Sequence, residues 1–126
     1  MSEQADELKR RTYQFTLDVI ELAKTFSTVE PGPTIKRQLL KAATSVGANY
    51  RAACRARSHR DFTSKIGVVA EEADECQHWL NVVADARLSA SPELQRLRRE
   101  STELVAIFSR QVGTARLNER RRRSEP

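Results

Sequence analysis

Four stretches of the sequence repeat their apolar residues every three or four positions, and turn-forming residues separate them. This spacing places the apolar side chains on one stripe of an α-helix. The predicted helices cover residues 6–27, 34–57, 59–88 and 92–117, and the connections between them are short. Short connections make consecutive helices antiparallel neighbours. The sequence therefore predicts an all-α domain, an antiparallel up-down-up-down four-helix bundle over residues 1–117.

The connections carry recognisable start and stop signals. Pro31-Gly32-Pro33 ends the first predicted helix and forces a turn, after which Thr34 can cap the second. Ser58 and Asp61 have the spacing of a capping box at the start of the third helix. Ser91-Pro92 opens the fourth helix, with serine as the cap and proline at the first helical position. Residues 118–126 are polar and charged, which predicts a disordered, arginine-rich tail.

The second predicted helix contains a run of small residues, 42–48, that predicts a close helix–helix contact. Gly47 in the middle of a helix costs about 1 kcal/mol relative to alanine, so its presence indicates that a neighbouring backbone comes near. We also expect Asn49, near the core side, to form a hydrogen bond to another helix.

Two of the predicted helices carry more apolar surface than one core requires. The first and the third each have a second apolar band beside the core stripe, and so large an apolar surface is unfavourable in a monomer. We expect a homo-oligomer that buries these bands; a thicker core with a few exposed apolar side chains is the alternative. Glu72 and Glu75 lie within the wide band of the third helix and either meet an arginine across a contact or form a solvated rim. The predicted interface residues are Tyr13, Leu17, Ile20, Val68, Glu72, Glu75, Trp79 and Val82.

Charge is distributed unevenly along a chain whose net charge is +5. Residues 1–86 are balanced, whereas residues 87–126 hold 10 basic and 5 acidic residues and supply the whole excess. Residues 36–65 hold eight basic residues against the single Asp61, and residues 71–85 hold five acidic residues and no basic one.

The basic residues of the second helix share one side, directed away from the core. Their spacings bring them to nearly the same helical angle, and such a row can neutralise phosphates and release counterions. The turn that follows and the arginine tail extend this basic character. An ordinary solvated face with a solubilising tail is the alternative, and the scarce aromatic residues predict no stacking platform. The candidate nucleic-acid-binding residues are Arg37, Lys41, Arg51, Arg55, Arg57, Arg60, Arg120, Arg121, Arg122 and Arg123.

No motif indicates catalysis, a metal or a cofactor. Cys76 and His78 point about 200° apart on a helix, and His59 falls at a helix start, so neither a zinc site nor a general base is expected. Cys54 lies about 20 Å from Cys76 along the bundle, too far for a disulfide. The longest apolar runs are far too short to span a membrane, and the N-terminus lacks a signal peptide. We therefore expect a cytoplasmic protein without catalytic residues, cofactors or a small-molecule substrate.

The sequence resembles a family of four-helix bundles first noticed in the intervening sequences of bacterial 23S ribosomal RNA genes. The resemblance is carried by Gln38-Leu39-Leu40-Lys41-Ala42-Ala43-Thr44-Ser45-Val46-Gly47-Ala48-Asn49-Tyr50 and continues through Ala56-Arg57-Ser58, Asp61-Phe62, Lys65, Glu71-Glu72-Ala73-Asp74-Glu75 and Trp79-Leu80. It covers roughly residues 15–115. An acidic residue often follows the Asn-Tyr pair in such proteins, and here Arg51-Ala52-Ala53 replaces it.

The resemblance implies a four-helix bundle that assembles into a ring-like homopentamer. It also implies kinship with the accessory proteins of diversity-generating retroelements, which bind nucleic acid and a reverse transcriptase. Our leading hypothesis is a non-enzymatic pentameric scaffold that binds RNA or DNA through phosphate contacts. The rival hypothesis is a protein-binding adaptor that uses the apolar bands and the acidic third helix.

Overall fold

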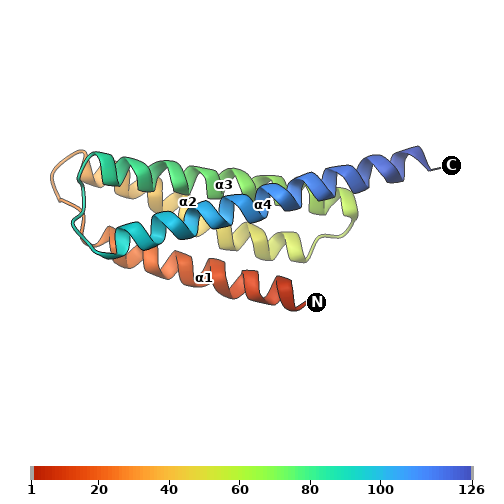
Figure 1. Ribbon diagram of the computed structural model, residues 1–126, viewed down its shortest axis with the longest axis horizontal. Coiled ribbons are helices and arrows are strands. Elements are labelled where there is room, and N and C mark those ends of the chain that lie inside the picture. The colour runs from red at the N-terminus through yellow and green to blue at the C-terminus, as the bar shows by residue number, and fades with distance from the viewer. Residues whose placement is uncertain (1, 126) are drawn as a thin grey trace.

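The computed structural model describes residues 2–125, and these residues form four helices and no strand. In Figure 1 the α1–α2 and α3–α4 connections lie at one end of the molecule, and the α2–α3 connection lies at the other end, towards the N-terminus. α2 packs on α1 and α3, α4 packs on α3, and the backbones of α1 and α4 approach each other at few points. The prediction of an all-α, four-helix fold is confirmed. The helices are α1 (Glu3–Ala23), α2 (Gly32–Cys54), α3 (His59–Asp85) and α4 (Glu93–Ser124).

One apolar core runs between the four helices, and each helix contributes its predicted stripe. Among the largest fully buried side chains are Phe15 of α1, Leu39 of α2, Ile66 of α3 and Phe108 of α4. The ring of Phe108 packs at 5.3 Å from the ring of Tyr50, which ties α4 to α2. The periodicity of the sequence therefore identifies the buried face of every helix.

A serine side chain caps α3 as predicted, whereas the predicted cap of α4 is wrong, because Pro92 and not Ser91 is the N-cap of that helix. The Ser58 hydroxyl accepts the backbone N–H of Asp61 at 3.0 Å, so the predicted cap of α3 is confirmed. At α4 the Ser91 hydroxyl accepts the N–H of Glu93 at 3.2 Å, and the helix begins one residue later than the sequence predicts.

The first connection differs from its prediction. α1 ends at Ala23, and α2 begins at Gly32, so Thr34 is not its cap. Instead, the Glu30 carboxylate accepts the backbone N–H of Thr34 at 2.9 Å and its hydroxyl at 2.7 Å. A side chain at position 32 would overlap the carbonyl oxygen of Ser27, so this tight entry into α2 requires glycine. A carboxylate thus takes the role that the sequence pattern gave to threonine.

α3 ends at Asp85 rather than at residue 88. The N–H of Leu88 donates to the Val83 carbonyl at 3.0 Å, and the N–H of Arg87 donates to the Ala84 carbonyl at 3.2 Å. This is a Schellman motif, in which the residue after the cap is left-handed and usually glycine. Arg87 takes that place with φ 57°, so the sequence carries no glycine to mark the helix end.

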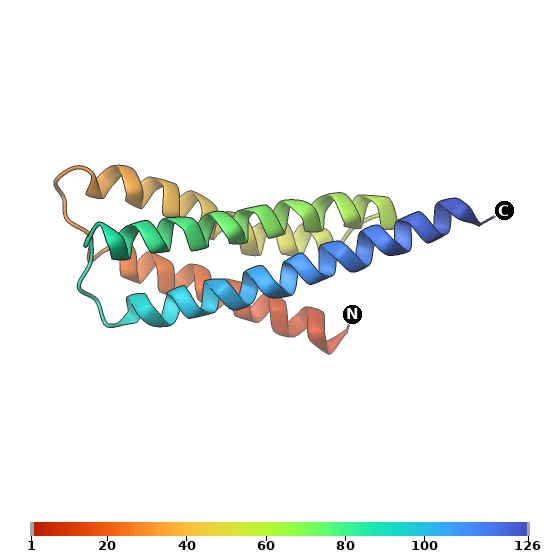
Figure 2. The same cartoon turned by 45° about the horizontal axis from the view of Figure 1, so that its top comes forward.

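The predicted disordered tail is largely helical. α4 continues to Ser124, and only Pro126 of the predicted tail lies outside the described residues. Arginine is a good helix former, and cationic side chains in the last turn interact favourably with the helix dipole. Arg123 also lies 3.4 Å from the Glu119 carboxylate, four residues earlier. Figures 1 and 2 show the C-terminal part of α4 extending past the α2–α3 connection.

The small-residue run of α2 packs closely against α1, as predicted. A Cβ atom added to the buried Gly47 would lie 3.4 Å from the Thr12 hydroxyl oxygen. The Thr16 hydroxyl donates to the Ala43 carbonyl of α2 at 3.0 Å. The expected role of Asn49 is wrong, because its amide donates to the Ser45 carbonyl within α2 rather than to another helix.

Candidate nucleic-acid interface

The outward face of α2 and its C-cap Arg55 form a stripe with basic residues at both ends. Its exposed positions recur every three or four residues, and α2 contains no acidic residue. From Arg37 to Arg55 the stripe covers 18 residues, or about 27 Å at the rise of an α-helix. Every predicted nucleic-acid-binding residue is exposed. The basic stripe comprises Arg37, Lys41, Arg51 and Arg55, with Thr44 and Ala48 between them.

The two halves of the basic stripe have different electrostatic surroundings. At the α2 N-terminal half, the Arg37 guanidinium donates to the Thr34 hydroxyl at 3.3 Å. The hydroxyl and the backbone N–H of Thr34 lower the pKa of Glu30, and the charge of Arg37 lowers it a little further. Within residues 2–125, Arg51 and Arg55 make neither an ion pair nor a side-chain hydrogen bond. Their charges are therefore available to an external anion.

The α2–α3 connection adds Arg57 and Arg60, both exposed. The carboxylate of Asp61 in this turn accepts a hydrogen bond from the Lys65 ammonium group at 2.5 Å. It accepts another from the Arg57 backbone N–H at 3.2 Å. These contacts, led by the one to Lys65, lower the pKa of Asp61. Because Asp61 is occupied by Lys65, it leaves the guanidinium groups of Arg57 and Arg60 without an ion pair in the described chain.

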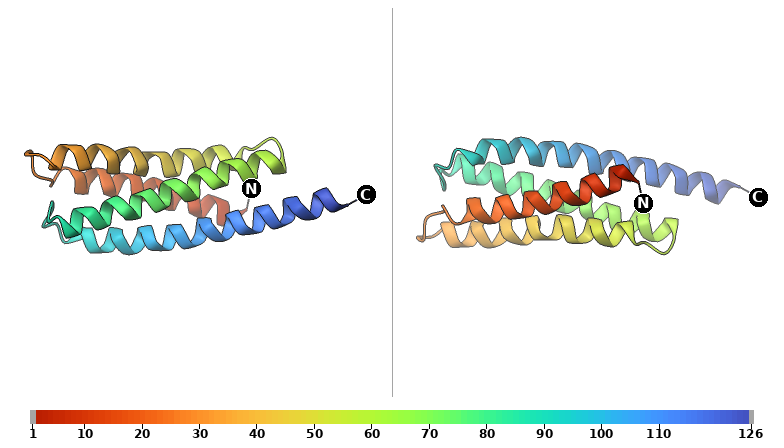
Figure 3. Two further views of the ribbon diagram at one scale, coloured as in Figure 1. Left: turned by 90° about the horizontal axis from the view of Figure 1, so that it is seen from above. Right: turned by 90° about the horizontal axis from the view of Figure 1, so that it is seen from below.

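The end of α4 is a second basic element, separate from the basic stripe. Arg120, Arg121, Arg122 and Arg123 are exposed on consecutive helical positions, about 100° apart, so they point in all directions around the axis. Only Arg123 has an ion-pair partner among the described residues. Figure 3 shows this part of α4 clear of the other three helices in both views.

The predicted interface residues on α1 are exposed to different degrees. Tyr13 retains 64% of its accessible surface and Leu17 retains 41%, whereas Ile20 is half-buried. They share one side of α1, opposite the core stripe. Within residues 2–125, Tyr13 and Leu17 are therefore left largely uncovered.

The predicted band on α3 lies beside α2. Val68 is exposed, and Glu72, Glu75, Trp79 and Val82 are half-buried. The Trp79 indole N–H donates to the Glu75 carboxylate at 3.3 Å. Neither Glu72 nor Glu75 forms an ion pair in the part of the chain that the structure describes, so no arginine of the same chain meets them.

Glu72 is held in an unfavourable place for a charge. Burial raises its pKa, the Glu75 carboxylate raises it further, and Lys41 of α2 partly offsets both effects. A raised pKa means that the folded protein binds this proton more tightly than the unfolded chain does. The free energy of unfolding therefore rises as the pH falls through the folded-state pKa of Glu72. At neutral pH the ionised carboxylate lacks this stabilisation.

Replacing Glu72 with glutamine is expected to stabilise the protein at pH 7, because it removes the penalty of the partly buried charge. The gain should not exceed about 1 kcal/mol, the usual ceiling for a surface charge. Thermal unfolding at pH 7 and at pH 4 measures it, and the gain should shrink at the lower pH, where Glu72 is protonated in the parent. Glu71→Gln, at an exposed position, is the matched control; an equal gain there would contradict this account.

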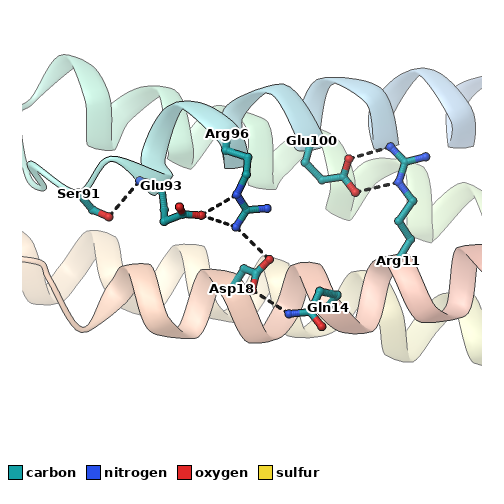
Figure 4. Close-up of polar contacts among 7 residues, drawn as sticks. All are labelled: Arg11, Gln14, Asp18, Ser91, Glu93, Arg96 and Glu100. Carbon is teal, nitrogen blue, oxygen red and sulfur yellow. Dashed lines mark hydrogen bonds and ion pairs between the residues drawn. The ribbon is translucent and has the colours of Figure 1, made fainter.

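Ion pairs join α1 to α4, and the sequence analysis did not identify them (Figure 4). The Arg11 guanidinium donates two hydrogen bonds to Glu100, at 2.7 and 2.8 Å. Arg96 donates to Asp18 at 3.1 Å, and Gln14 donates to the other oxygen of Asp18 at 2.9 Å. These pairs cross the side of the bundle where the backbones are least closely packed, and we call them the α1–α4 seam. The two residues of each ion pair are about 80–90 residues apart in the sequence, so no local pattern predicts these pairs.

The cysteines are both free, Cys54 half-buried and Cys76 fully buried. Residues 2–125 contain no group of three or more histidine, cysteine or acidic side chains placed to hold a metal ion. Among the helices that the structure describes, none has the length and apolarity to cross a membrane.

Comparison with known proteins identifies relatives of the whole bundle. The family model of the 23S rRNA-intervening sequence proteins matches residues 5–110. A crystal structure from Bacteroides thetaiotaomicron, of a protein of unknown function from the S23 ribosomal protein family, has a similar fold with a TM-score of 0.75. The two chains share 24% identity, over 86% of this chain and 97% of the other. No curated protein matches the sequence significantly.

Proposed function

Because the chain belongs to the 23S rRNA-intervening sequence protein family, we propose that it is a non-enzymatic, oligomeric helical scaffold that binds RNA or DNA through phosphate contacts. The family is linked by its name to an element of ribosomal RNA genes. An accessory role beside such an element, or beside a reverse transcriptase in the cytoplasm, fits a protein that holds a polyanion without modifying it.

The observation that carries this proposal is the pair Arg51 and Arg55. They are exposed one turn apart on a helix without acidic residues, and neither has an anionic partner among the described residues. A cation already paired with a carboxylate must give up that partner to bind phosphate. Unpaired cations only release the counterions of the nucleic acid, which is favourable at low salt.

Oligomerisation would multiply this effect. The exposed apolar side chains on α1, led by Tyr13 and Leu17, support burial between copies. The assembling unit of this proposal is an antiparallel up-down-up-down bundle, and the resemblance noted above favours a pentamer. Several basic stripes around one ring create a stronger positive potential than a single chain. Sedimentation equilibrium tests the assembly: a pentamer has five times the chain mass of 14.3 kDa, and a stable monomer at micromolar concentration would refute it.

A salt titration tests the binding. Fluorescence anisotropy with a mixed-sequence RNA duplex should show binding at about 50 mM salt, and the affinity should fall with a log–log slope of about −0.9 per phosphate contact, the value for a double helix. Four to six contacts from the basic stripe and the α2–α3 connection predict a slope between about −3.5 and −5.5. Absence of binding at low salt, or affinity that does not change with salt, would overturn the proposal.

A protein-binding adaptor is the second candidate. The exposed apolar side of α1 and the acidic residues of α3 would serve a protein partner equally well. A pull-down from the native cell after nuclease treatment separates the two functions. A stoichiometric protein that remains bound, together with no RNA binding in the titration, would favour the adaptor.

A further inference from the structure

A pocket of about 800 Å³ opens at the end of the bundle where the α2–α3 connection lies. Its walls come from the first turns of α1, the end of α2, the start of α3 and the last part of α4 inside the bundle. Ligand pockets in proteins usually measure about 300–1,000 Å³, so this volume suits a small organic group. The pocket lies beyond the last ion pair of the α1–α4 seam, since Arg11 forms part of its lining.

The floor of the pocket is apolar. Leu8, Ala53 and Ala115 are buried, and Phe62 and Ile107 are half-buried, so parts of the last two side chains face the opening. A flat, weakly polar group can replace water against such a surface, as a nucleobase does against apolar and aromatic side chains.

The rim of the pocket is polar, and four of its uncharged side chains have no hydrogen-bond partner within residues 2–125. Gln4, Gln111, Thr114 and Asn118 line the opening, and none of them forms a side-chain hydrogen bond there. Amide side chains offer both donors and acceptors, which matches the edge of a base.

One cation of the rim is also free. Arg110 is exposed and forms no ion pair within residues 2–125, whereas Arg11 is bound to Glu100 and Glu103 and the acidic Glu7 is bound to Arg10. Further unpaired arginines flank the lining residues in the sequence, Arg57 and Arg60 on either side of Ser58-His59 and Arg116 next to Ala115. The acidic residues Glu3, Asp6, Asp61 and Glu119 flank lining residues in the same way, so the attraction for an anion comes from the unpaired Arg110 at the rim itself.

We propose that this pocket binds one unpaired nucleotide, with the base against Phe62 and Ile107 and the phosphate at Arg110. The inference rests on the proposed nucleic-acid binding and gives it a substrate class: RNA with a bulged or single-stranded nucleotide beside a paired region. A paired base is stacked within its duplex and does not enter the pocket. The basic stripe holds the backbone without regard to sequence, and the pocket distinguishes unpaired from paired RNA.

The pocket contains its own reporter, the thiol of Cys54. Cys54 lines the pocket and is half-buried, whereas Cys76 is fully buried and its burial raises the pKa of that thiol. A thiol reagent such as N-ethylmaleimide therefore labels Cys54 first, since the thiolate is the reactive form. A ligand that fills the pocket slows this labelling.

The experiment measures the labelling rate of Cys54 in the full-length protein, with Cys54→Ser to confirm the source of the signal. The ligands are adenosine monophosphate, ribose 5-phosphate, a fully paired RNA hairpin whose strands are joined by a polyethylene glycol linker in place of a nucleotide loop, and the same hairpin with one bulged nucleotide. The bulged hairpin at saturation should slow labelling at least threefold, and the paired hairpin and ribose 5-phosphate should not. If adenosine monophosphate also slows the labelling, the pocket binds free nucleotides as well as unpaired nucleotides of RNA.

Blocking the pocket supplies the second arm. Thr114→Trp, at an exposed rim position, should abolish the preference for the bulged hairpin, and Gly113→Trp, at the adjacent position with no neighbouring atom within 4 Å, should keep it. If the parent binds both hairpins with equal affinity and the labelling of Cys54 does not change, the proposal that the pocket binds an unpaired nucleotide is wrong. The proposed phosphate binding would still stand. Loss of all RNA binding at low salt would instead overturn the proposed function.

Discussion

Changing Arg51 and Arg55 together to glutamate should weaken RNA binding about 100-fold at about 50 mM salt. Two lost phosphate contacts reduce the log–log salt slope by about 1.8, and at low salt this corresponds to roughly two orders of magnitude in affinity. Neither arginine forms a side-chain hydrogen bond or an ion pair within residues 2–125, so the folded structure should survive the change. Fluorescence anisotropy at several salt concentrations measures both the affinity and the slope.

A control variant with the same change of net charge distinguishes an effect of the basic stripe from an effect of the total charge. Arg10 and Lys24 of the α1 region are exposed and already paired, with Glu7 and Glu21. Changing both to glutamate alters the net charge equally but leaves the basic stripe intact, so the affinity should fall much less. An equal loss in both variants would show that only the overall charge matters, and it would refute the assignment of the interface to α2.

Changing Gly47 to leucine should lower the free energy of unfolding by about 3 kcal/mol, the upper part of the range for overpacked cores. The first added carbon would already be in contact with Thr12, 3.4 Å from its hydroxyl oxygen and 3.6 Å from its Cβ atom, and three further carbons must fit beside it. Either α1 moves outward or leucine takes a strained rotamer. Urea unfolding followed by circular dichroism gives the difference.

Gly113→Leu is the matched control, because position 113 is an exposed helical glycine with no neighbouring atom within 4 Å. Leucine forms helix better than glycine, so this variant should be up to about 1 kcal/mol more stable than the parent. If Gly47→Leu were equally harmless, the close packing of α1 on α2 would not be what fixes glycine at position 47.

The fold could be predicted because apolar spacing reports which side of a helix is buried. The predictions of local structure that were wrong have local causes. Thr34 fits the pattern of a cap, but the Glu30 carboxylate reaches the same N–H. The end of α3 is marked by Arg87 in a conformation that normally requires glycine. The arginine tail resembles a disordered segment in composition, yet the same residues favour a helix C-terminus.

The candidate interface could also be predicted only in part from the sequence. The basic stripe could be found because Arg37, Lys41, Arg51 and Arg55 belong to one helix, whose period orders them. The pocket could not be found, since it unites residues from α1, the α2–α3 connection and α4, about 50 residues apart from one to the next. Aromatic side chains counted only as core residues, such as Phe62, line an opening once the helices are placed.

The α1–α4 seam has a consequence for how the protein opens. α1 packs closely on α2, but it meets α4 largely through ion pairs, which added salt screens and water can replace. Of the neighbouring helix pairs, α1 and α4 approach each other at the fewest backbone positions, so separating them disrupts the least packing. Amide protons of α1 should exchange with solvent through a partial opening that leaves α2, α3 and α4 assembled, and this opening should become easier as ionic strength rises.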